Sequence, residues 1–270
     1  LLARFGLRGV LDLTRPWRLL LLVLALAVGM LSGFRSFVLL SGFTLGILFW
    51  LEGLHRTRYM PALLGAALLA GVVVLPQAQR LPLMVQRSLS FLPGKFDWMA
   101  RQSALGSMEW RLGMWKDVLP EVPRYLFRGK GWTYDARDFA VAVEVGEAGN
   151  PLAGTILVGD FHNGPLSVLI PFGIYGAIAF VWFLAVGLRV LHRNWKFGSP
   201  ALRNVNALLL AAFGGQAIFF FFCFGSLNSD MAIFAGLLGM SVALNGASVT
   251  PALAEQPTAG IDLNTEYIKA

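Results

Sequence analysis

The chain has 270 residues, of which 56% are hydrophobic and only 14% are charged, and its mean hydropathy is +0.64. A soluble domain of this length is less apolar, so the composition indicates an integral membrane protein. The net charge of +7 fits basic loops on the cytoplasmic side of a membrane, and no basic stretch alternates with stacking aromatics as nucleic-acid binding would require. The single cysteine, Cys223, excludes an intrachain disulfide and a cysteine-based metal site.

Six apolar segments are candidates for crossing the hydrocarbon core of a membrane, which is about 30 Å thick. They lie at residues 17–34, 37–54, 61–76, 165–190, 205–224 and 231–247. No convincing strand pattern accompanies them, so the predicted fold class is all-α, a polytopic transmembrane helical bundle of about six spans. The predicted division is membrane helices 1–3 in residues 1–76, a loop of interfacial helices in 77–163, membrane helices 4–6 in 164–247 and a tail in 248–270.

The short loops predict the orientation of the chain. Basic residues precede the first span, follow the second, and separate the fourth from the fifth: Arg4, Arg8, Arg15, Arg18, Arg56, Arg58, Arg189, Arg193, Lys196 and Arg203. With alternating spans these clusters share one side, which the positive-inside rule assigns to the cytoplasm together with the tail. The connections at 32–36, 77–163 and 225–230 then share the opposite side. Because the chain begins Leu1-Leu2, we expect its N-terminus to be the cut edge of something longer.

Two arginines on that opposite side stand out. Arg35, in "SGFRS", is the only charge in a tight turn where few cations are expected. Its planar guanidinium suits a phosphate, and the alternative is a side chain that reaches the lipid headgroups. Arg111 lies four residues before Trp115, which places a cation beside an indole on one helix face; the alternative is ordinary anchoring at the membrane interface.

Two further motifs lie in the same long loop. Gly129-Lys130-Gly131 permits a tight turn or a nest of amides around a phosphate, and Lys130 meets either an anionic headgroup or solvent. His162 lies beside Asp160 and next to a span. An imidazole accepts a proton from a hydroxyl, and a nearby carboxylate orients it; the alternative is a satisfied loop histidine.

The order of these motifs resembles the O-antigen ligase superfamily. A histidine followed by Asn163, nine residues, Gly173, two residues and Gly176 is similar to the family's histidine signature. "SGFRS" resembles its Ser-Gly-x-Arg turn, "EWRLGMW" its Arg-x-x-x-Trp helix and "YLFRGKGW" its Gly-x-Gly loop, in the family's order. The resemblance covers the chain from residue 20 to residue 225 and corresponds to the C-terminal half of a typical member.

The resemblance implies an inverting glycosyltransferase that needs neither metal nor cofactor. Such enzymes lie in the bacterial inner membrane and move a glycan from undecaprenyl diphosphate to an acceptor hydroxyl at the periplasmic face. Arg35 and Arg111 would neutralise the diphosphate leaving group, and His162 would act as general base or position the acceptor. The residues expected to bind or orient the substrates are Asn163, Trp115, Gly129, Lys130 and Gly131, with Asp160 added from its proximity to the histidine. Gly173 and Gly176 would let neighbouring spans approach closely.

Several functions share these motifs. A ligase that uses lipid A core as acceptor is favoured because the histidine motif is closest to its pattern. The alternatives within the superfamily are a polymerase that extends a glycan on its carrier and an enzyme that modifies protein hydroxyls. Outside it, the alternative is a non-enzymatic transporter or scaffold for the lipid carrier, for which Gly214-Gly215-Gln216 in the fifth span is the only mild sign. Membrane lipids are expected partners of all of them.

Overall fold

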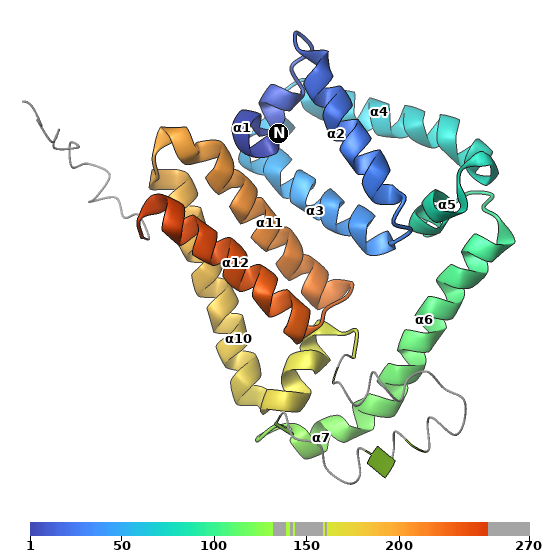
Figure 1. The fold of residues 1–270 in the computed structure, drawn as a ribbon, viewed down its shortest axis with the longest axis vertical. Helices are drawn as coiled ribbons and strands as arrows, with labels where there is room; N and C mark the ends of the chain where they lie inside the picture. Colours follow the sequence, from blue (N-terminus) through green and yellow to red (C-terminus); the bar gives the residue numbers. More distant parts are fainter. Residues whose placement is uncertain (132–138, 141–142, 144–158, 160, 248–270) are drawn as a thin grey trace, which may run out of the picture.

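The computed structural model describes residues 1–131, 139–140, 143, 159 and 161–247 (Figure 1). Every regular element with bounds in this part of the chain is a helix, which confirms the all-α prediction. The elements are α1 (Leu2–Val10), α2 (Pro16–Met30), α3 (Arg35–Leu51), η1 (Leu54–Arg56), α4 (Tyr59–Val74), η2 (Leu75–Arg80), α5 (Leu83–Leu89), α6 (Trp98–Val118), η3 (Leu119–Glu121), α7 (Val122–Tyr125), α10 (Gly164–Phe197), η4 (Pro200–Leu202), α11 (Arg203–Phe222) and α12 (Leu227–Asn245).

Each of the six predicted spans is a helix. Within the described residues, four stretches are long and apolar enough to cross a membrane: Tyr59–Arg80, Gly164–Phe197, Pro200–Phe222 and Leu227–Asn245. The helices α2 and α3 are equally apolar but have 15 and 17 residues. The helix of the fourth predicted span continues past residue 190 to Phe197. The apolar pattern ends before Arg193 and Lys196, but both residues favour a helix, so the helix extends beyond the apolar segment. The protein is therefore a polytopic membrane protein.

Helix α11 forms the centre of the fold. It packs against α3 on one side and against α10 and α12 on the other (Figure 1). Gly215 makes the first contact close, since a Cβ there would lie 2.9 Å from the Thr44 hydroxyl. On the other side, the rings of Phe180, Phe220 and Phe234 form the core between α10, α11 and α12. These contacts fix the end of α11 relative to the starts of α3 and α10.

Helix α10 is interrupted near its start, and the loop that follows α7 supplies the missing backbone hydrogen bonds. Gly173 has a φ of 65° and a ψ of −166°, so the helical hydrogen bonds cannot continue through it. The loop replaces them, because Lys130 N donates to Ile170 O over 2.7 Å and Gly131 N donates to Pro171 O over 2.9 Å. A Cβ at Gly173 would overlap the carbonyl of Phe127. The partner of this glycine is therefore a loop rather than the neighbouring span expected from the sequence.

Candidate functional site

A pocket of about 550 Å³ lies where the α2–α3 turn, α5, α6, the start of α10 and the end of α11 meet. The three residues predicted to be catalytic, Arg35, Arg111 and His162, all line it. They come from segments far apart in the sequence, and the pocket also includes Phe224 from the connection between α11 and α12. Residues from two of the three connections predicted to share a side, 32–36 and 77–163, thus line one pocket together with Phe224, which directly precedes the third.

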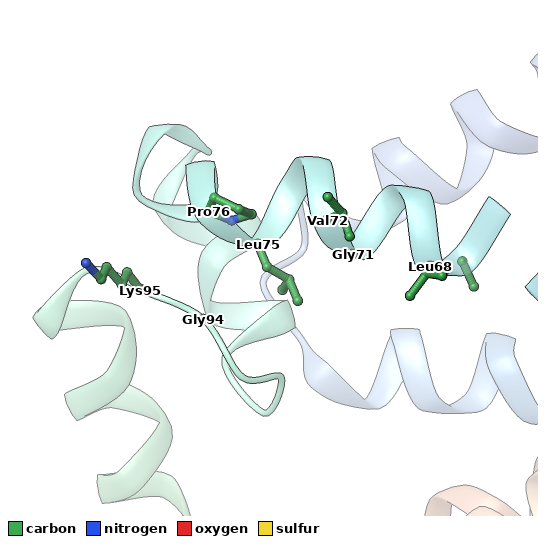
Figure 2. A pocket seen from close by; sticks show the side chains of 8 residues that line it. Leu68, Gly71, Val72, Leu75, Pro76, Gly94 and Lys95 are labelled. Atoms are coloured by element: carbon green, nitrogen blue, oxygen red, sulfur yellow. The ribbon is translucent and has the colours of Figure 1, made fainter. Parts of the chain in front are cut away.

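A second hollow, of about 590 Å³, lies along α4. Figure 2 shows Leu68 and Val72 on this helix and Leu75 at the start of η2, with Gly94 and Lys95 on the segment before α6. Its lining includes none of the residues that the sequence analysis selected. The first pocket is therefore the candidate functional site.

Arg35 is the first residue of α3 and is held against α6. The turn before it contains Gly33, whose φ of 73° favours glycine. The Arg35 guanidinium donates from Nη2 to the carbonyl oxygen of Ala104 over 3.2 Å. A guanidinium has five N–H donors, so this bond orients the side chain and leaves further donors for an anion in the pocket.

Arg111 lies in the middle of α6 with its guanidinium over an aromatic ring. Its Cζ is 5.1 Å from the centroid of the Phe224 ring, within the range of a cation–π contact. Its Nε is buried and has no hydrogen-bond partner within the described residues. Burial, and then the nearby charge of Arg35, lower the pKa of the Arg111 guanidinium from its ordinary value. An arginine stays charged at neutral pH. A bound anion would therefore compensate both the burial of this charge and its repulsion by Arg35.

His162 is fixed between two aromatic rings immediately before α10. The centroid of its imidazole lies 5.0 Å from the Trp110 ring and 4.9 Å from the Phe224 ring. Its φ of 47° is in the left-handed region that a residue with a side chain rarely adopts. Backbone strain of this kind recurs at functional sites. Phe224 touches both His162 and Arg111, so it sets the distance between the predicted base and the predicted phosphate-binding group.

The other predicted site residues that the structure describes do not line the pocket. Asn163 caps α10, where its Oδ1 accepts from Leu166 N over 3.1 Å. Trp115 donates from Nε1 to the Phe161 carbonyl over 2.9 Å, next to His162. The amides of Lys130 and Gly131 bond to α10, whereas a phosphate-binding nest requires free amides. Asp160 lies outside the described residues.

Two charged or aromatic pocket residues that contribute to the site, Arg87 and Phe224, escaped the sequence analysis. Trp110, which contacts the His162 ring from outside the pocket lining, belongs to the "EWRLGMW" motif, but the motif gives it no role. Phe224 ends the fifth predicted span, and the sharing of one side by the connections was the signal that could have found it. Arg87 is one of many cations in the long loop, and no spacing distinguishes it.

The pocket combines positive charge with a proton acceptor. Arg35 and Arg111 make no ion pair with a carboxylate in the described part of the chain. Among the same residues, no three His, Cys, Asp or Glu side chains lie close enough to hold a metal ion. The imidazole and the guanidinium groups share an apolar wall of Phe219, Phe222 and Phe224. Such a site suits an anionic, partly apolar ligand next to a group that accepts a proton.

Comparison with known families agrees with this geometry. Residues 20–181 match the family model described as O-antigen ligase, and this match contains Arg35, Arg111 and His162. No curated protein and no solved structure matches the chain. The family match covers more than half of the sequence. Together with the membrane-spanning helices, it shows that the chain belongs to the O-antigen ligase family of membrane glycosyltransferases of the ligase or polymerase type.

Proposed function

We propose that this protein transfers a glycan from undecaprenyl diphosphate to an acceptor hydroxyl at the periplasmic face of the bacterial inner membrane. The observation that carries the proposal is the meeting of Arg35, Arg111 and His162 in one pocket. Phe224 contacts the Arg111 and His162 side chains, and this supports a proton acceptor next to a group that binds the anion. Family membership supports lipid-linked glycans as substrates.

The proposed reaction is an inverting displacement at the anomeric carbon of the donor sugar. The acceptor oxygen forms a bond to this carbon while the bond from the carbon to the diphosphate oxygen breaks, and the hydroxyl proton passes to the imidazole of His162. Negative charge grows on the leaving diphosphate. Arg35 and Arg111 stabilise that charge from positions fixed before the reaction, which is where electrostatic catalysis is most effective. Two guanidinium groups supply charge that other transferases take from a divalent metal ion.

The acceptor is proposed to be lipid A core, because the His162-Asn163 motif is closest to the ligase pattern. A polymerase with the same pocket is the second candidate. The products in a deletion strain distinguish them. Full-length glycan that accumulates on its carrier identifies a ligase, whereas single units on the acceptor identify a polymerase. Normal amounts of mature lipopolysaccharide in that strain would refute both assignments.

The transporter or scaffold reading rests on Gly214-Gly215-Gln216. In the structure these residues lie inside α11, a continuous helix. Gly215 packs against Thr44 of α3, and Gln216 donates to Asp230 over 2.8 Å. Both contacts are explained by helix packing, so this segment adds no support for a transport pathway. The break in α10 is filled by the loop backbone.

A further inference from the structure

Arg87 is a third arginine at the pocket, and neither the family motifs nor the sequence pattern assign it a role. It lies in α5 and lines the pocket together with Arg35 and Arg111. Among the described residues, the pocket lining contains no aspartate or glutamate. Three guanidinium groups therefore face one cavity without a compensating carboxylate from this part of the chain, and their charge is more than one phosphate group requires.

The backbone that carries Arg87 is held on both sides of this residue. Gln86 is buried, donates to Leu81 O over 2.8 Å and accepts from Asp97 N over 2.8 Å. Ser88 is also buried and donates to the carbonyl of Met30, at the end of α2, over 3.1 Å. These bonds fix α5 against the segments next to it. Arg87 itself is exposed, so its side chain is presented to the pocket from a rigid support.

The charged groups form an ordered series along the pocket. His162 and Arg111 share the ring of Phe224. The Arg35 guanidinium bonds to Ala104, two turns before Arg111 on α6, and Gly33 in the turn before Arg35 lies against Met84, about one turn before Arg87 in α5. Arg35 is thus the middle cation, and Arg87 lies at the end of the series away from the imidazole. The two phosphates of a lipid diphosphate can follow the same order. The sugar-linked phosphate is bonded to the reacting carbon, and the prenyl-linked phosphate lies further from that carbon.

We propose that Arg87 binds the prenyl-linked phosphate and thereby makes the pocket select a polyprenyl diphosphate over a polyprenyl monophosphate. This inference rests on the proposed function, because it takes the acceptor and the sugar to lie at the His162 end. The sugar-linked phosphate then lies with Arg111 and Arg35. A monophosphate satisfies those two arginines and gains nothing from Arg87.

Equilibrium binding of two lipids to the full-length protein in detergent tests the proposal. The probes are undecaprenyl diphosphate and undecaprenyl monophosphate, each radiolabelled. Arg87→Ala is expected to weaken binding of the diphosphate by about ten- to hundredfold, the usual value of a charge-assisted hydrogen bond, and binding of the monophosphate by less than about twofold. Arg87→Lys is expected to restore part of the difference, because it keeps the charge and loses the planar fork.

Arg80→Ala is the matched control, since Arg80 lies seven residues earlier, is exposed and does not line the pocket. It should leave both affinities unchanged. An equal effect of Arg87→Ala on the two lipids, or no effect on either, would overturn the assignment of Arg87 while the proposed function stands. If the unmodified protein binds neither lipid, the proposed function fails as well.

Discussion

The indole of Trp115 holds the backbone immediately before His162, and Trp115→Phe removes that single hydrogen bond. Its Nε1 donates to the Phe161 carbonyl over 2.9 Å, and the next residue has the unusual φ of 47°. A neutral hydrogen bond contributes about 0.5–1.5 kcal/mol. If this energy positions the imidazole in the transition state, loss of the bond lowers kcat by about two- to twelvefold. Arg35 and Arg111 are untouched, so the KM for the donor should stay the same.

Initial rates of glycan transfer by the full-length protein, measured against donor concentration, give both constants. Trp98→Phe is the matched control, because Trp98 begins the same helix and is 70% exposed. It should change neither kcat nor KM. An unchanged kcat in Trp115→Phe, or an increase in KM with kcat preserved, would refute the positioning role.

Three further outcomes follow from the structure. Gly129→Ala adds a side chain to a residue with a φ of 70°, and the new Cβ would overlap the Pro171 carbonyl. Thermal unfolding in detergent should therefore show that the free energy of unfolding falls by about 2–4 kcal/mol. Gly113→Ala, in open space on α6, should leave this free energy unchanged. Asn163→Ala should lower the free energy of unfolding by about 1 kcal/mol, because α10 loses its N-terminal cap. Asn163→Asp keeps the cap and should keep the stability. A fall in the transfer rate of Asn163→Asp would therefore report a contact of Asn163 with the acceptor. Chelation with EDTA should leave the transfer rate within about twofold of its original value, because guanidinium groups supply the positive charge; a loss that Mg²⁺ restores would contradict this.

Three of the residues that line the pocket, Arg35, Arg111 and His162, could be selected from the sequence. Charge asymmetry of the short loops placed Arg35, Arg111 and His162 on one side of the membrane, and the motif order connected them. The contacts of Arg111 and His162 with Phe224 were not predictable, because they depend on the position of the connection between α11 and α12. Phe224 ends an apolar run that looks the same as any other span, and only the folded chain places its ring between the imidazole and the guanidinium.

The Gly-x-Gly loop has the backbone conformation expected from its sequence but uses its amides in another way. Its glycines do adopt positive φ angles, as the sequence suggested. The sequence permitted either a tight turn or a phosphate-binding nest, and the amides of Lys130 and Gly131 bond to the carbonyls of Ile170 and Pro171. The break at Gly173 leaves those carbonyls without partners inside α10. The local sequence does not indicate which segment supplies their hydrogen-bond donors.

In the proposed reaction, His162 accepts the proton of the acceptor hydroxyl while the arginines hold the diphosphate. Transfer from an undecaprenyl-diphosphate-linked glycan to lipid A core, measured together with donor binding for His162→Ala and Arg35→Ala in the full-length protein, tests it most directly. We expect His162→Ala to bind the donor normally but to transfer the glycan at least about a hundredfold more slowly, whereas Arg35→Ala should lose donor binding. Transfer by His162→Ala at the unmodified rate would contradict it.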